Sequence, residues 1–358
     1  MRRRRVIGIV GGTLFVFAAG FPPAGTAQLS GKDTIPPVNV GGFIDTYFSW
    51  NFARPRAHIN QLRNFDITEN QIVLSAAEVD FQRAPEPVGF RVDLTTGSAS
   101  DIINSGGPPT LNMFLQAYLT ALVPFGQGLT VDAGKFTTHM GFESIKTKDD
   151  YNYSRSFLFA WSIPYYHLGV RASYPLLDNL TGGVSVCNGW NGTDANSGKT
   201  FGTSITFVPT PGSSIMANWI GGPQEPDSVG SKFRHVFEGI VTLETSDRVS
   251  LAIDGNFGTE AFPWGTAIWE GVALYGRYAA TENSFVSARA EVYSDPQGYT
   301  TAIAQDLKEV TVTYEYRFPR NLMIRAEYRY DWSTRAAFGG SVPRDNQSTL
   351  CVGAIVTF

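Results

Sequence analysis

Charged side chains recur at alternate positions in the hairpin near the C-terminus. Glu315 and Arg317 lie in its first strand, Arg325 and Glu327 lie in its second, and apolar or aromatic residues stand between them. Because strand side chains point to opposite faces with a period of two, one face of this hairpin is charged and the other is apolar. Carboxylates and guanidinium groups on one face can pair across the ladder and stiffen a wall. They can equally set the ion preference of an aqueous passage that the wall encloses.

The same alternation continues through the preceding strands and assigns a set of polar side chains to one common face. Both signs of charge are interspersed in this set, so we expect no strong single-sign field of the kind that selects polyanions. If the strands enclose a lumen, the pore-lining candidates are Asp45, Arg91, Asp93, Asp132, Arg171, Glu238, Arg289, Glu291, Glu315, Arg325, Glu327 and Arg329.

The sequence carries no motif for a catalytic, metal or cofactor site. The four histidines are isolated from one another, and no H-E-x-x-H, G-x-S-x-G or phosphate-loop motif occurs. No C-x-x-C-H motif for covalent haem is present either. We therefore predict no catalytic residue, no metal and no cofactor. In the expected strand order, Cys187 and Cys351 lie on nearly opposite walls, too far apart for a disulfide. We therefore expect both residues to carry free thiols.

Residues 1–27 have the composition of a secretory signal peptide. Four arginines follow the first methionine, an apolar stretch covers residues 6–20, and small residues precede position 28. The alternative is an anchoring helix, but the apolar stretch is short for one and two prolines follow it. We expect a periplasmic linker over residues 28–38 and a transmembrane β-barrel over residues 39–358.

Any membrane role of the remaining chain must rest on a closed barrel. Mean hydropathy is -0.09, no later stretch supplies about twenty consecutive apolar residues, and closed barrels also satisfy every backbone hydrogen bond in lipid. The sequence ends with Leu350, Val352, Ala354 and Val356 on one face and Phe358 as its last residue. This ending is similar to the terminal signal by which the barrel assembly machinery of bacterial outer membranes recognises barrels. The net charge of -4 gives no reason to expect a nucleic-acid partner.

Long and short connections alternate along the chain. Residues 97–110, 138–164 and 257–266 form long connections, whereas residues 124–128 form a short one. Outer-membrane barrels have short periplasmic turns and longer external loops. Counting the strands between the connections gives about sixteen, an even number that places both termini in the periplasm. The sequence therefore predicts an all-β fold, a transmembrane antiparallel up-and-down β-barrel of about 16 strands, wide enough for an aqueous channel unless loops fill it.

The longest expected loop, residues 139–162, could fold into such a lumen or lie over its mouth, and the sequence leaves both alternatives open. Folded inward, it would bring charges to the narrowest part of the passage, where charged rings set selectivity. The candidate constriction residues are Glu143, Lys146, Lys148, Asp149, Asp150 and Arg155. The aromatic run at the end of the loop could equally begin the next strand. In the strand before the loop, Lys135 shares the lipid-facing phase with Leu129 and Val131, so either a bulge intervenes or Lys135 reaches the headgroups.

Five segments carry strand signatures beyond simple alternation, namely residues 41–48, 87–94, 114–118, 128–143 and 153–156. They resemble the OmpL-like β-barrel porins of Gram-negative bacteria, and the resemblance extends over nearly the whole chain after the signal peptide. It implies an outer-membrane protein, in contact with lipid and lipopolysaccharide, through which small hydrophilic solutes and ions diffuse passively. It supplies no catalytic residue, and porins of this size are often homotrimers. Two other functions fit the same fold: a barrel-embedded hydrolase of the lipase or protease type, and a sealed barrel with a structural or adhesive role.

Overall fold

The computed structural model describes residues 36–104, 111–192, 196–229, 233–263, 265–339 and 342–358. The predicted signal peptide, residues 1–27, lies outside the described residues, as does most of the predicted linker. The first strand begins at Asn39, where the sequence places the start of the barrel.

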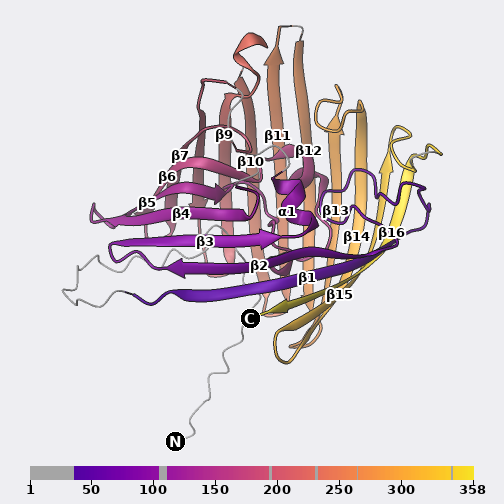
Figure 1. Cartoon of the computed structure of the whole chain (residues 1–358), viewed down its shortest axis with the longest axis horizontal. Coiled ribbons are helices and arrows are strands. Elements are labelled where there is room, and N and C mark those ends of the chain that lie inside the picture. Colours follow the sequence, from indigo (N-terminus) through magenta and orange to yellow (C-terminus); the bar gives the residue numbers. More distant parts are fainter. Residues whose placement is uncertain (1–35, 105–110, 193–195, 230–232, 264, 340–341) are drawn as a thin grey trace, which may run out of the picture.

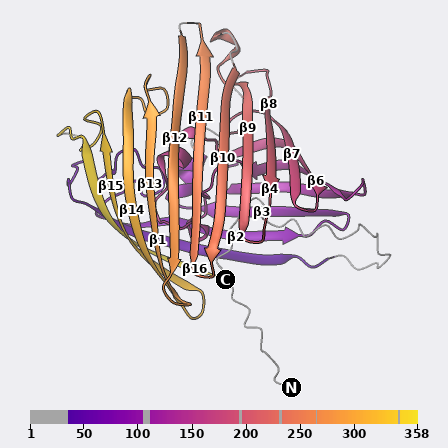
Figure 2. The ribbon, with the colours of Figure 1, turned by 180° about the vertical axis from the view of Figure 1, so that it is seen from behind.

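Sixteen antiparallel strands form one closed barrel, in which each strand pairs with its neighbours in sequence and the first strand pairs with the last (Figures 1 and 2). The predicted architecture is therefore confirmed. The strands are β1 (Asn39–Asn51), β2 (Ile72–Arg83), β3 (Val88–Thr96), β4 (Phe114–Val123), β5 (Leu129–Thr137), β6 (Tyr166–Leu177), β7 (Leu180–Cys187), β8 (Thr200–Phe207), β9 (Ser213–Pro223), β10 (Phe233–Ser246), β11 (Val249–Phe262), β12 (Gly265–Ala279), β13 (Ser284–Asp295), β14 (Gln305–Phe318), β15 (Leu322–Ser333) and β16 (Asn346–Thr357).

Helices are few and short. The described residues contain α1 (Ser98–Ile103), the 3-10 turns η2 (Thr147–Asp149) and η4 (Asp227–Val229), and the π-helical turn η3 (Leu158–Ser162). No helix among the described residues is long and apolar enough to cross a membrane.

The alternating sequence pattern produces two different barrel faces. In β14, Val312 is 52% exposed on the outer face, whereas the neighbouring Thr313 is completely buried on the inner face. The outer side chains of β14 and β16, such as Val310 and Val352, are apolar and exposed. An apolar outer belt and a polar interior are what a barrel needs in order to stand in lipid.

The terminal residue takes part in closing the barrel. The backbone N–H of Gly42 donates to the carbonyl of Phe358 at 3.1 Å, and the N–H of Phe358 donates to the carbonyl of Gly42 at 3.0 Å. A Cβ atom on Gly42 would lie 2.4 Å from the Phe358 ring, so the close approach of the ring requires glycine there.

One connection differs from the prediction. Residues 257–266 were expected to form a long loop, but β11 and β12 continue pairing up to Phe262 and Gly265. The prediction of a loop was wrong because β11 and β12 extend beyond the height of the other strands. At that height no lipid requires every second side chain to be apolar. β12 has 15 residues, whereas β7 and β8 have 8 each, so one side of the barrel stands taller (Figures 1 and 2).

The side chain of Lys135 shares the outward phase of Leu129 and Val131. Neither a bulge nor a position among the lipid headgroups is needed to explain it. It pairs with Ala117 and Leu168 without a shift in register. Its ammonium group donates to the Asn104 side chain at 2.6 Å and lies 3.9 Å from the centre of the Tyr166 ring. The connection between β3 and β4 therefore covers this charge, which is only 4% exposed.

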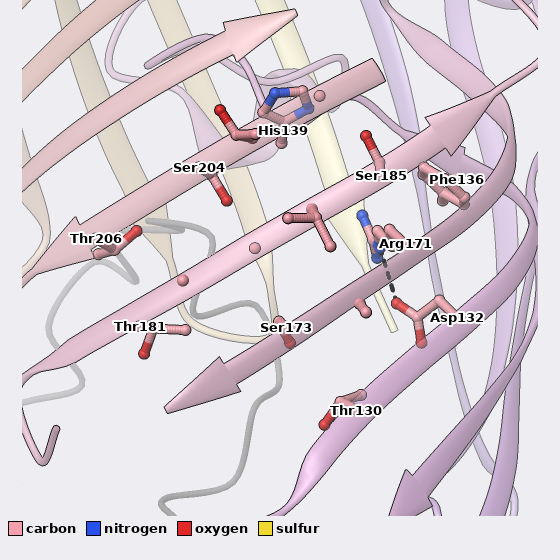
Figure 3. A pocket seen from close by; sticks show the side chains of 16 residues that line it. Thr130, Asp132, Phe136, His139, Arg171, Ser173, Thr181, Ser185, Ser204 and Thr206 are labelled. Carbon is pink, nitrogen blue, oxygen red and sulfur yellow. Dashed lines mark hydrogen bonds and ion pairs between the residues drawn. The ribbon is translucent and has the colours of Figure 1, made fainter. Parts of the chain in front are cut away.

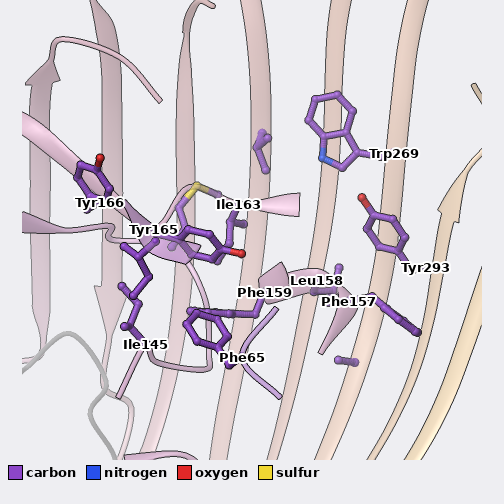
Figure 4. Packing of buried hydrophobic residues seen from close by; sticks show 14 of the residues in the cluster. Phe65, Ile145, Phe157, Leu158, Phe159, Ile163, Tyr165, Tyr166, Trp269 and Tyr293 are labelled. Atoms are coloured by element: carbon purple, nitrogen blue, oxygen red, sulfur yellow. The ribbon is translucent and has the colours of Figure 1, made fainter. Parts of the chain in front are cut away.

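The connection between β5 and β6, residues 138–165, folds into the lumen, and we call it the inward loop. Its aromatic run forms the π-helical turn η3 and not the start of a strand. Phe157 and Phe159 of this run pack in a buried cluster with Phe65 from the first external loop and with Trp269 and Tyr293 from the wall (Figure 4). Burial of these apolar side chains stabilises the inward position of the loop.

Candidate functional site: the lumen and its inward loop

Wall carboxylates bind consecutive backbone amides of the inward loop. Glu327 in β15 accepts hydrogen bonds from the N–H groups of Tyr153 and Ser154 at 2.5 and 2.9 Å. Glu291 in β13 accepts from Phe157 and Leu158 at 2.7 and 2.6 Å. Buried amides need acceptors, and an ionised acceptor makes a stronger hydrogen bond than a neutral one.

Wall arginines bind the carbonyl groups of the same loop. Arg325 in β15 donates to the carbonyls of Thr147 and Asp150, each at 2.6 Å, and also pairs with Glu315 at 2.7 Å. Arg289 in β13 donates to the carbonyl of Ser154 at 2.7 Å.

Arg289 and Arg329 also make side-chain ion pairs at this wall. Arg289 lies 2.5 Å from Glu143 of the loop and 2.6 Å from Glu309 of β14. Arg329 pairs with Asp331 at 2.6 Å and donates to the backbone of Arg155. Together with the carbonyl contacts, these pairs hold the loop against β13, β14 and β15.

The loop also contacts the wall on the other side of β16. Lys146 pairs with Glu78 of β2 and lies 2.8 Å from Asp93 of β3. The Tyr153 hydroxyl donates to Asp45 of β1 at 2.9 Å. The loop therefore contacts an arc of the wall on both sides of β16, from β13–β15 to β1–β3.

A third group of contacts holds the start of the loop at β10 and β11. Both carboxylate oxygens of Glu238 accept from the N–H of Gly141, at 2.9 and 3.0 Å. Asp254 accepts from the N–H of Phe142 at 3.3 Å. No lysine or arginine pairs with either carboxylate among the described residues.

The wall formed by β5, β6, β7 and β8 differs, because it borders a hollow beside the inward loop (Figure 3). Hydroxyl groups and glycines make up most of its inner face. The space that water can occupy there is about 60 Å³, room for several water molecules. Its polar lining comes from Thr130, Asp132, His139, Arg171, Ser173, Thr181, Ser185, Ser204 and Thr206.

The charged groups of the hollow neutralise each other. Arg171 pairs with Asp132 at 2.8 Å, and its guanidinium lies over the rings of Phe136 and Tyr118, with its carbon 4.6 and 5.4 Å from their centres. His139 of the inward loop borders the hollow and hydrogen-bonds the carbonyl of Trp219 at 3.1 Å. Burial lowers the pKa of His139 to about 4, so this imidazole is neutral at pH 7.

The sequence profile of the family described as "Putative beta-barrel porin-2, OmpL-like" matches residues 37–358. The chain belongs to this porin family. It is therefore a porin of the bacterial outer membrane, a passive channel, as its strand segments implied. A comparison with curated protein sequences finds no match.

Several solved structures share the fold of this porin at low sequence identity. The anion-selective porin from Comamonas acidovorans has a TM-score of 0.64 at 11% identity, over 90% of this chain and 99% of that chain. Salmonella typhi OmpF in complex with daunomycin has a TM-score of 0.63 at 13% identity, over 90% and 98%. In-vitro folded OmpT of Vibrio cholerae, in a trimer form, has a TM-score of 0.59 at 13% identity, over 91% and 100%. These likenesses show the fold.

In this porin, the predicted lumen residues have three kinds of surroundings. Asp45, Glu238, Arg289, Glu291, Glu315, Arg325, Glu327 and Arg329 are buried, and most of them contact the inward loop directly. Arg91 pairs with Asp93 at 2.8 Å and remains partly exposed. Asp132 and Arg171 border the hollow. That these residues line the route of solutes stays a prediction.

The predicted constriction residues divide in the same way. Glu143, Lys146, Asp150 and Arg155 are buried in ion pairs, and Asp150 lies 3.0 Å from Arg155. Burial alone would lower the pKa of Lys146, but the Asp93 and Glu78 carboxylates raise it above its ordinary value, so this lysine stays charged. The other two predicted constriction residues, Lys148 and Asp149, form an ion pair at 2.7 Å and are partly exposed.

Sequence reasoning missed the hydroxyl groups of the hollow and the contribution of the first external loop. Thr181, Gly183 and Ser185 alternate in β7, and Gly202 and Ser204 alternate in β8, a small-polar pattern that was visible but not used. Arg63 lies 2.8 Å from Asp331 in β15, yet nothing in the sequence of this loop indicated that it packs inside the barrel mouth.

Proposed function

We propose that solutes cross this porin through the space between the inward loop and the wall of β5–β8. The observation that supports this route is the contrast between the two sides of the loop. Toward β13–β15 its backbone is bound by buried carboxylates and guanidinium groups. Toward β5–β8 the wall carries small hydroxylated side chains and glycines next to a hollow.

The proposed passage discriminates little between cations and anions and carries out no covalent chemistry. One carboxylate and one guanidinium border the hollow, 2.8 Å apart, and His139 is neutral at pH 7. A wall with balanced charges exerts little net attraction on either sign of ion. The Nε2–H of His139 donates to the Trp219 carbonyl at 3.1 Å, and its Nδ1 has no hydrogen bond to a hydroxyl of the hollow among the described residues.

Site-directed thiol labelling during single-channel recording tests the route. Ser204→Cys places a thiol at the hollow, and Thr313→Cys places one on the inner face of β14, where the loop buries the wall. We expect a charged, thiol-reactive methanethiosulfonate to lower the conductance of the Ser204 variant and to leave the Thr313 variant unchanged. The unmodified protein, whose Cys187 and Cys351 are both buried and not joined in a disulfide, reports any background reaction. Equal block of both variants would contradict the proposed route.

We also propose that the porin assembles as a homotrimer. The support is the trimer form of Vibrio cholerae OmpT, whose fold this chain shares. Light scattering from the detergent-solubilised protein, corrected for bound detergent, measures the protein mass directly. A mass of one chain under conditions that preserve the folded barrel would contradict the assembly.

A further inference from the structure

The hollow beside the inward loop has a wall of hydroxyl groups that the protein itself does not use. Strand register places Thr130 opposite Ser173 and Thr181 opposite Thr206. Ser204 lies opposite Gly183 in the neighbouring strand. None of these side-chain hydroxyls has a hydrogen-bond partner among the described residues. The hydroxyl of Ser185, a residue only 8% exposed, is buried there without a partner as well.

Glycines keep these hydroxyls uncovered. A Cβ atom on Gly183 would lie 2.5 Å from the Ser204 hydroxyl oxygen, and one on Gly202 would lie 2.5 Å from that of Ser185. Any larger residue would displace the hydroxyls from the wall. Apart from His139 of the inward loop, the side chains labelled in Figure 3 come from the adjacent strands β5 to β8, and all of them line the hollow.

The chemistry of this wall matches one class of solute. A hydroxyl both donates and accepts, so a wall of hydroxyls can exchange hydrogen bonds with a solute that carries donors and acceptors on neighbouring carbons. Unpaired buried polar groups favour a ligand that satisfies them. The Asp132–Arg171 pair adds fixed acceptors and donors without net charge, and the Phe136 ring adds an apolar surface to the lining.

We propose that the wall of β5–β8 is a binding subsite for neutral polyhydroxylated solutes, such as monosaccharides and short polyols. The solute places one face in the hollow and keeps the other face toward the open lumen. This inference rests on the proposed passage beside the inward loop and adds the class of solute that the passage prefers.

Two measurements on the full mature chain test the subsite, with glucose as the probe and tetraethylene glycol as a neutral compound of similar mass with few hydroxyls. In planar bilayers, we expect glucose to reduce the ion current in a saturable way and tetraethylene glycol to reduce it without saturation. Saturation transfer from the detergent-solubilised barrel to glucose, followed by NMR, reports binding independently of conductance.

The test variant combines Ser185→Ala, Ser204→Ala and Thr206→Val. Loss of three hydrogen bonds should weaken glucose binding by about tenfold or more. The matched control combines Ser214→Ala and Thr242→Val in β9 and β10, whose hydroxyls bond each other at 2.7 Å outside the hollow, and we expect it to bind glucose normally.

The possible outcomes separate the subsite from the passage. Unchanged glucose binding in the triple variant, or equal saturable block by both solutes, would overturn the subsite while leaving the channel intact. Saturation transfer that depends on the three hydroxyls, in a barrel that passes no current, would support the subsite and contradict the passage.

Discussion

The ammonium group of Lys146 in the inward loop lies 2.8 Å from a carboxylate oxygen of Asp93 in β3. The same ammonium also bonds Glu78 in β2. Both carboxylates are almost completely buried, and Asp93 also pairs with Arg91, so one cation from the loop joins a charged group of the wall. The loop and the wall therefore depend on each other at this point of the lumen.

Replacing Lys146 with methionine should release the loop from β2 and β3. The change leaves Glu78 buried without its cation and Asp93 with Arg91 as its remaining partner, which costs on the order of 3 kcal/mol. We expect a lower temperature for the heat-induced shift in gel mobility and a larger single-channel conductance. Lys148→Met is the matched control, because its pair with Asp149 is partly exposed and contributes about 1 kcal/mol or less. Equal behaviour of the two variants would show that the Lys146 pairs do not hold the loop.

Replacing Arg325 with lysine should loosen the loop although the charge is kept. The guanidinium donates in two directions, to the carbonyls of Thr147 and Asp150, while it pairs with Glu315. A lysine ammonium cannot reproduce this planar arrangement of donors. We expect faster proteolytic cleavage within residues 138–165, read by mass spectrometry. Arg317→Lys, which alters a more exposed partner of the same Glu315, should not increase cleavage.

Two single substitutions in the hollow should shift ion selectivity in opposite directions. Asp132→Asn leaves the Arg171 charge and should favour anions, whereas Arg171→Gln leaves the Asp132 charge and should favour cations. An unbalanced charge beside a narrow aqueous passage changes the ratio of permeabilities roughly fivefold, equivalent to about 1 kcal/mol. The reversal potential in a salt gradient measures both shifts against an unmodified protein near zero. Reversal potentials that stay near zero in both variants would place the ion route elsewhere.

Acidification should weaken the docking of the inward loop through His139. Burial lowers the pKa of this imidazole from 6.5 to about 4, so a released loop takes up a proton more readily than a docked one. The contribution of neutral His139 to the free energy of loop docking therefore has its full value above about pH 6.5. As the pH falls from there to about pH 4, this contribution decreases by about 1.4 kcal/mol per pH unit. Protonation is further disfavoured by the nearby Arg171.

Conductance recorded between pH 7 and pH 4 measures this loss as a rising current or as more frequent open events. His139→Gln keeps an amide donor for the Trp219 carbonyl and removes the titration, so its response to pH should be flatter. A His139→Gln variant with the same pH response as the unmodified protein would assign the effect to other groups.

Deleting Phe358 should reduce assembly in cells more than folding in detergent. The residue resembles a terminal assembly signal, and its backbone makes two of the hydrogen bonds that join the barrel ends. We expect less folded protein in outer-membrane fractions, measured by heat-modifiable gel mobility, and substantial refolding of the purified chain. Phe358→Tyr keeps an aromatic terminus and serves as the control, with near-normal assembly expected.

Strand boundaries and faces followed from the sequence because lipid and water impose a period of two on each strand. The pattern placed Val312 outside and Thr313 inside, and the structure agrees. The pattern failed between β11 and β12, where the strands pass beyond the height at which lipid enforces alternation. Charges on the inner face were also assigned to the correct side, since Glu315, Glu327 and Arg329 are all buried inside.

The sequence by itself therefore determined a barrel of sixteen strands, its closing residue and its two faces. Only the tertiary structure decided what the inner charges contact. The position of the inward loop depends on contacts such as Tyr153 with Asp45, 108 residues apart, and Phe157 with Glu291, 134 residues apart. A strand pattern is set by neighbours in sequence and by the surrounding medium. A loop in a polar lumen has no such period, and its place follows from hydrogen bonds that exist only once the barrel has closed.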